Sequence, residues 1–156
     1  PVSTPFDIYT ASFDTSINSQ DSNPTDIAWN DDGSRLYEID STGDKIYQSA
    51  VSTPYDIDTA SVSTSISTQD NSSRGIAWND DGSRLYEAGS SNDRIYQYTV
   101  STPFDIASAS VSTSIPSQDT TVQGIEWNDD GSRFYEVGSI TDRIYQYTVS
   151  GGWEAF

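Results

Sequence analysis

The chain contains no histidine, cysteine or methionine. Without cysteine it forms no disulfide and has no thiolate nucleophile, and without histidine it lacks the commonest general base and the usual imidazole ligand of metals. Lysine is nearly missing as well, since Lys45 is the single one among 156 residues. No catalytic constellation of side chains stands out, so we expect neither an enzyme nor a bound cofactor or metal.

Positive charge is scarce: seven Lys and Arg residues stand against 24 Asp and Glu residues, for a formal net charge of −17 at pH 7. Such a surface repels nucleic acid and anionic membranes, so we expect neither as a partner. No apolar run approaches the roughly 18 to 20 residues that cross a bilayer, and no basic-then-apolar leader is seen. The acidity is typical of a halophilic protein, and equally of a solubility-biased or engineered surface.

What the chain does contain is one motif written three times. The tryptophans Trp29, Trp78 and Trp127 are spaced 49 residues apart. The same spacing relates one proline and one tyrosine of each copy: Pro5, Pro54 and Pro103, and Tyr37, Tyr86 and Tyr135. A period of this size indicates a single repeat array over 1–156, in which each unit buries its apolar face on its neighbours.

Each copy predicts four β-strands. Residues 26–30 alternate between apolar and polar side chains, the period of a half-buried strand, and 35–39 form a second strand after an Asp-Gly hairpin turn. Residues 94–100 show the third strand most fully because they are rich in β-formers. The Ser/Thr-coated segment 110–115 is weakly apolar and suits the outer edge of a sheet. No amphipathic helical period persists, so we expect an all-β chain.

Four antiparallel strands in a unit of roughly 40 to 50 residues are typical of a β-propeller blade. The stretch WNDDGSRLYEAGSSNDRIYQYTV, residues 78–100, resembles the blades of NHL- and YVTN-type propellers, which carry a similar hairpin and an Arg-Ile-x-x-Tyr strand. That resemblance implies a propeller of four-stranded antiparallel blades. The copies depart from it at two positions, where the family often has Pro and Val: Asp31, Asp80 and Asp129, and Glu38, Glu87 and Glu136. No activity is therefore carried over.

The order of the predicted strands points to assembly. Residues 1–21 contain a connection and a strand that corresponds to the fourth strand of a blade and would complete another blade. Residues 22–70 and 71–119 form two blades. Residues 120–149 form the first three strands of a third blade, and 150–156 begin a further connection. Three blades are too few to close a ring. We expect the N-terminal strand to complete the last blade of a second chain, so that two chains form a six-bladed dimer. A head-to-tail filament, or a longer array of which this is a segment, remains open.

The predicted assembly residues lie at the two ends. Phe13 and Ile17 belong to the N-terminal strand, and Trp153 and Phe156 belong to the C-terminal segment. In that segment Gly151 and Gly152 replace the Thr-Pro of the other copies, and Trp153 replaces Phe. The segment occupies the repeat position that residues 1–7 of a partner would also claim, so we expect one of the two to be displaced.

The repeated tryptophans have two interpretations. They fill the space between adjacent blades, which we favour, or they stack on sugars in a glycan site. Glu126 replaces an alanine of the other copies on the strand that lines a propeller channel, where it binds a cation or polar ligand or is simply a solvated acid. Trp153 is a second candidate ligand contact.

The polar motifs also allow more than one reading. The Asn-Asp-Asp-Gly turns favour structural hairpins over calcium loops, because calcium loops need alternating carboxylates and a distant Glu. Six of the seven basic residues occupy two repeat positions, and we expect each to pair with a repeated Glu or Asp. Asn71 begins an N-glycosylation pattern. Together with the Ser/Thr-rich edge strands, this pattern weakly favours an extracellular or cell-surface location, which nothing else in the sequence determines.

The sequence thus predicts a non-enzymatic, structural, self-assembling propeller module whose partner is itself. A lectin-like or small-ligand-binding propeller is the alternative. An enzyme of the lactonase or lyase kind ranks last, because the symmetric copies leave little room for an asymmetric active site.

Overall fold

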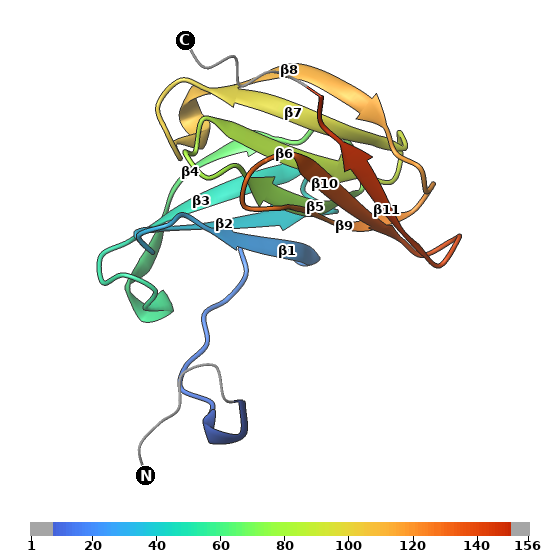
Figure 1. Ribbon diagram of the computed structural model, residues 1–156. Coiled ribbons are helices and arrows are strands. Elements are labelled where there is room, and N and C mark those ends of the chain that lie inside the picture. The colour runs from blue at the N-terminus through green and yellow to red at the C-terminus, as the bar shows by residue number, and fades with distance from the viewer. Residues whose placement is uncertain (1–7, 151–156) are drawn as a thin grey trace.

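A computed structural model describes residues 8–150 and contains three antiparallel β-sheets there (Figure 1). The first sheet has the order β1-β2-β3-β4: β1 Pro24–Trp29, β2 Arg35–Asp40, β3 Lys45–Val51 and β4 Ala60–Ser67. The second has the order β5-β6-β7-β8: β5 Ser73–Trp78, β6 Arg84–Gly89, β7 Arg94–Val100 and β8 Ala109–Pro116. The third has three strands in the order β9-β10-β11: β9 Val122–Trp127, β10 Arg133–Gly138 and β11 Arg143–Thr148. The predicted all-β fold of antiparallel blades is confirmed.

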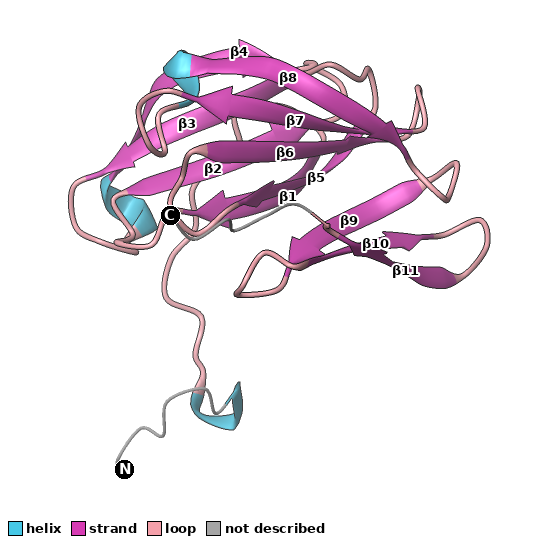
Figure 2. Ribbon diagram, turned by 45° about the horizontal axis from the view of Figure 1, so that its top comes forward, coloured by secondary structure: helices cyan, strands magenta, loops and turns pink. Residues whose placement is uncertain are grey.

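The sheets are meanders that meet at their first strands. β1 and β5 contact each other, as do β5 and β9, whereas β4 and β8 lie at outer edges (Figure 2). Three short 3-10 turns complete the regular structure of residues 8–150: η1 Ile8–Thr10, η2 Ile57–Thr59 and η3 Ile106–Ser108. Within that range no helix is long and apolar enough to cross a membrane.

The predicted third and fourth strands match the second sheet closely, since β7 covers 94–100 and β8 contains 110–115 at the sheet edge. The predicted N-terminal strand behaves differently. Phe13 and Ile17 are exposed, and their segment pairs with no strand among residues 8–150. The segment instead forms part of an arm that leads away from the sheets (Figure 1).

The first hairpin of each sheet is held by its own side chains. Asn30 accepts a hydrogen bond from the Arg35 amide at 2.9 Å through Oδ1 and donates to Asp32 Oδ1 at 2.9 Å through Nδ2. Asp32 Oδ1 also accepts from the Ser34 amide at 2.8 Å, and Gly33 adopts a φ of 70° that favours glycine. The other two copies repeat this arrangement, so the predicted structural hairpin is confirmed.

A glutamate in the middle of each sheet holds the loop that leads into that sheet. Glu87 is fully buried and accepts hydrogen bonds from the amides of Gln69 and Asp70, each at 3.0 Å, from Ser73 Oγ at 2.7 Å and from the Tyr98 hydroxyl. Burial raises the pKa of Glu87, and the four donors stabilise its carboxylate against that effect. Because these donors are amides and hydroxyls, the hypothesis that the repeated glutamates pair with arginine is wrong.

A second carboxylate joins the same loop to the turn between the second and third strands. Asp70 accepts from the amides of Ser72 at 2.8 Å, Ser91 at 3.0 Å and Asn92 at 2.7 Å. A Cβ added to Gly89 would lie 2.2 Å from the Cβ of Asp70, so this arrangement requires glycine there.

In the first sheet a different residue supplies the carboxylate that binds the loop and the turn. Asp40 stands at the repeat position of Gly89 and accepts from the Asn23 amide at 3.1 Å, from the Thr42 amide at 2.6 Å and from the Gly43 amide. These three donors are the repeat equivalents of those that bind Asp70. The carboxylate site is therefore kept although the residue that fills it has moved from the loop to the strand.

We expect Asp70→Ala to lower the free energy of unfolding by about 2 kcal/mol, because buried amides then lose their acceptor. Adding Gly89→Asp in that background should recover much of the loss, since it recreates the arrangement of the first sheet. Asp21→Ala is the matched control and should cost little, because Asp40 already occupies that site. Urea unfolding followed by circular dichroism measures all three, and an Asp21→Ala loss equal to that of Asp70→Ala would contradict the account.

In the third sheet the same site makes stability depend on pH. The Thr141 hydroxyl, at 2.6 Å, and neighbouring amides lower the pKa of Asp119 to about 2. A lowered folded-state pKa contributes stability above the unfolded pKa of about 3.9, and this contribution is lost as the pH falls toward 2. Thr141→Val should raise the pKa of Asp119 and shift acid unfolding to higher pH in a circular dichroism titration. Exposed Thr148→Val is the control and should leave the acid midpoint in place.

Candidate functional site

The seams between adjacent sheets are packed with aromatic and aliphatic side chains. The Trp78 ring centroid lies 4.9 Å from that of Tyr37 in the first sheet and 5.3 Å from that of Phe104. At the next seam Trp127 lies 4.9 Å from Tyr86 of the second sheet. Trp78 and Trp127 therefore lie between sheets, and their indole N–H groups are buried without a hydrogen-bond partner among the described residues.

The long connection before the edge strand β8 also crosses a seam. We call residues 102–106 the strap, because this segment precedes β8 of the second sheet but binds the first sheet. Arg35 Nη1 donates to the Pro103 carbonyl at 3.2 Å and the Tyr37 hydroxyl donates to the Phe104 carbonyl at 2.5 Å. The Ile106 amide donates to Gln48 Oε1 at 3.0 Å, and the Ile106 side chain is fully buried.

The outward face of the first sheet lacks such cover. The Ile27 side chain is 59% exposed, whereas its repeat equivalents Ile76 and Ile125, which lie in the two seams, are 4% and 7% exposed. Trp29 packs against Tyr55 of its own sheet, with ring centroids 5.4 Å apart. We call this surface the first open face.

The outward face of the third sheet is also uncovered, and it is the opposite kind of face from that of the first sheet. Ile144 is 76% exposed, whereas its equivalents Ile46 and Ile95 are 0% and 4% exposed. Val137 is also exposed, although its counterparts in the other sheets are fully buried. We call this surface the last open face. The hollow over it is bordered by Glu126, Tyr135, Val137 and Ile144. Within residues 8–150, β11 has no neighbour on its outer side.

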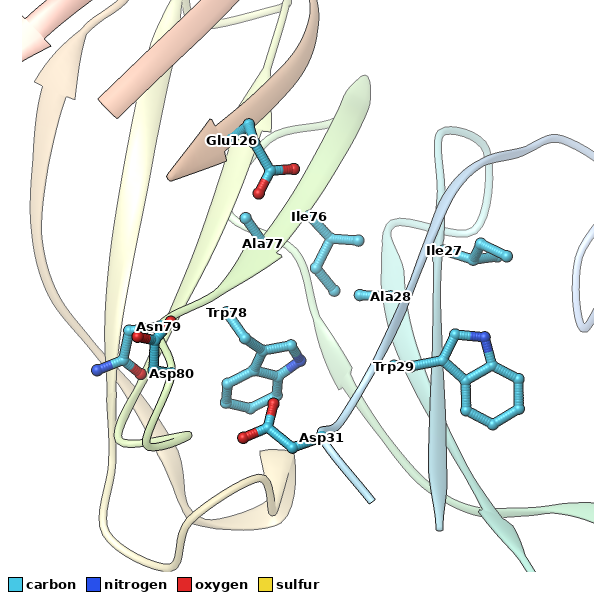
Figure 3. Close-up of a pocket in the computed structure, with 10 residues that line it drawn as sticks. All are labelled: Ile27, Ala28, Trp29, Asp31, Ile76, Ala77, Trp78, Asn79, Asp80 and Glu126. Atoms are coloured by element: carbon cyan, nitrogen blue, oxygen red, sulfur yellow. The ribbon is translucent and has the colours of Figure 1, made fainter. Parts of the chain in front are cut away.

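Glu126 lies where the last open face meets the inner strands. It is exposed and borders a cavity of about 270 Å³ whose lining includes Ala28, Trp78 and Asp31 (Figure 3). Ile27 and Trp29 lie on the opposite side of β1 from Ala28 (Figure 3). Trp78 makes tilted ring contacts with Tyr37 and Phe104. No cluster of three acidic residues within 8–150 is placed to hold a metal ion.

The remaining predicted site residues lie apart from one another. Phe13 and Ile17 are exposed on the N-terminal arm, and Asn71 is exposed in the loop between β4 and β5. Trp153 and Phe156 lie outside the described residues. The assembly, ligand and glycosylation roles assigned to these positions stay predictions.

Sequence reasoning missed the strap and the residues that bind it. Their signal was present, because the three residue types recur in every copy: Arg35, Arg84 and Arg133; Tyr37, Tyr86 and Tyr135; Gln48, Gln97 and Gln146. Periodicity showed that these side chains were required, but not that they bind backbone of the next repeat.

No protein-family model matches the sequence, and no curated protein matches it significantly. Solved structures resemble it. A functionally unknown protein from Desulfotomaculum acetoxidans superposes with a TM-score of 0.65 at 15% identity, over 82% of this chain and 40% of that one. The Swd1 β-propeller domain from Myceliophteria thermophila gives a TM-score of 0.60 at 16% identity, over 81% of this chain and 38% of that one.

A Bacteroides fragilis protein provisionally described as a 6-phosphogluconolactonase gives a TM-score of 0.66 at 14% identity, over 81% of this chain and 35% of that one. The chain thus spans well under half the length of these structures. Similarity at this level establishes the fold. The chain is a β-propeller module of three blade-like sheets.

Proposed function

We propose that this chain is a non-enzymatic structural module that assembles head-to-tail with copies of itself, the last open face of one copy against the first open face of the next. One observation supports this above all. Ile27 and Ile144 are exposed at the ends of the module, whereas the residues at the same repeat positions are buried in both internal seams. Each of these two kinds of face is covered at both internal seams, so we expect the uncovered copy of each to pack between chains.

The polar groups at the last open face fit the same contact. The third sheet carries Arg133, Tyr135 and Gln146, the repeat equivalents of the residues that bind the strap in the first sheet. The first sheet of a second copy brings its own connection, which contains Tyr55 and Ile57. A seam between copies then repeats the internal one, with apolar packing and strap hydrogen bonds.

The N-terminal arm supports completion of the third blade. Ser19 Oγ and the Gln20 amide bind Glu38 at 2.5 and 3.0 Å, as Ser117 Oγ and the Gln118 amide bind Glu136. The loop that enters the first sheet is therefore held as if a fourth strand preceded it. We propose that residues 11–18 pair with the free edge of β11 in the neighbouring copy.

Two three-bladed chains then complete a six-bladed ring, a size within the usual range of about four to eight blades. A seam angle that does not close would give a filament instead. The glycan alternative has less support, because Trp78 already packs against Tyr37 and Phe104. Glu126 keeps ligand binding in the channel as the second candidate, and its exposed carboxylate would favour a cation or a hydroxyl donor.

We expect a particle of twice the 17.1 kDa chain mass in sedimentation equilibrium. Salt should strengthen its assembly, because each copy carries a net charge of −17 that salt screens. Ile144→Asp should weaken assembly by more than about 100-fold, since it buries an unpaired carboxylate in the seam. Ile140→Asp is the matched control: Ile140 is also exposed, but its counterparts Thr42 and Ser91 are exposed too. A wild-type chain that remains monomeric at every salt concentration would overturn the proposal.

Head-to-tail contact makes a further prediction about mixtures. Ile27→Asp and Ile144→Asp chains should each be monomeric alone, because each has one damaged face. Mixed together they should form a heterodimer through the two intact faces, seen as one new species in native mass spectrometry. Assembly of either variant by itself would show that like faces meet, and would contradict the head-to-tail arrangement.

A further inference from the structure

The first sheet shows what a filled strap site requires. Three donor or acceptor groups from Arg35, Tyr37 and Gln48 bind the backbone of the strap, and the Ile106 side chain is fully buried beside them. The strap ends in the turn η3, which is capped by Asp105: its Oδ1 accepts a hydrogen bond from the Ala107 amide at 3.1 Å. A site of this kind therefore recognises both the backbone geometry of the segment that it binds and one buried apolar side chain.

The second sheet has the same site without an occupant among the described residues. Arg84, Tyr86 and Gln97 stand at the repeat positions of Arg35, Tyr37 and Gln48. Gln97 Nε2 donates to Ser112 Oγ at 3.0 Å, as Gln48 Nε2 donates to Ser63 Oγ at 3.3 Å. The carboxamide is thus oriented as in the filled site, and within residues 8–150 neither its oxygen nor the Tyr86 hydroxyl has a hydrogen-bond partner.

The N-terminus of the chain carries a matching segment. Residues 4–8 read TPFDI, identical to the strap at 102–106. The turn η1 begins at Ile8 as η3 begins at Ile106, so the same kind of turn follows both segments. Yet Ile8 is 88% exposed, whereas Ile106 is fully buried, and η1 lies away from the sheets (Figure 1). Residues 1–7 lie outside the described residues.

The C-terminal segment at the same repeat position is a poorer match by sequence. Gly151 and Gly152 replace the Thr-Pro pair that preorganises the strap, and Glu154 replaces the capping Asp. Ala155 stands where the filled site buries Ile106, so it would leave most of that pocket empty. The chemistry of the site therefore favours the N-terminal segment over the C-terminal one.

We infer that Arg84, Tyr86 and Gln97 form a docking site for residues 4–8 of a second copy of this chain. This inference rests on the proposed assembly but concerns a separate contact, one blade removed from the seam between copies. The position agrees with the repeat: the strap at 102–106 precedes the edge strand of the second sheet and binds the first. Residues 4–8 of an arm that completes the third sheet of a partner would likewise bind the partner's second sheet.

The test compares four single variants of the full chain by sedimentation velocity across a concentration series. Ile8→Ala should weaken dimerisation by at least about tenfold, because it empties an apolar pocket at the contact. Tyr86→Phe should weaken it by about fivefold through the loss of one hydrogen bond. Ile140→Ala, an exposed isoleucine outside the site, and Tyr37→Phe, whose site is filled within the chain, are the matched controls and should leave the dimerisation constant unchanged.

The outcomes separate this inference from the proposed assembly. A dimer that is weakened by Ile8→Ala and Tyr86→Phe but not by the controls supports the docking site. A dimer that all four variants leave unchanged overturns the docking site and keeps the assembly, whereas a monomeric wild type overturns both. A chain that ends at Ser150 should keep its melting temperature and dimerise at least as well. A lower melting temperature for it, with no Tyr86→Phe effect on assembly, would show that the C-terminal segment fills the site and would overturn the inference.

Discussion

A propeller blade has two apolar faces, and each needs a neighbour. The two internal seams of this chain bury Ile46, Ile76, Ile95 and Ile125, and the same repeat positions are exposed at the two ends. At roughly 25 cal/mol per Å² of buried apolar surface, an uncovered isoleucine forgoes about 2 kcal/mol. These uncovered ends are the physical basis of the assembly that we propose.

Polar side chains decide how the blades are joined rather than how strongly they pack. The buried carboxylate of Glu87 organises the loop entering its sheet, and Asp70 or its counterpart Asp40 connects that loop to the neighbouring turn. These sites fix the direction in which the chain leaves one blade for the next. In the first sheet Glu38 holds the end of the N-terminal arm in the same way, through Ser19 and the Gln20 amide.

Much of the fold was predictable because the same sequence pattern recurs in all three copies. The Asp-Gly hairpin at Gly33 and the strands at 94–100 and 110–115 depend on local turn chemistry, alternation and β propensity, which need no tertiary knowledge. The interpretation of the repeated glutamates as partners of arginine failed for a physical reason. A carboxylate close in sequence to a cation can instead be buried against amides brought from a distant loop, as Glu87 is.

The period, the strands, the turns and the strand order from which assembly was predicted could be derived from the residues alone, because they depend on local patterns and on how often these recur. The contacts that cross between repeats needed the tertiary structure: Tyr37 and Gln48 bind a strap 58 to 67 residues away, and Asp40 replaces a loop aspartate. Such contacts join backbone groups, which every residue has, so composition and spacing carry no record of which amide or carbonyl is bound.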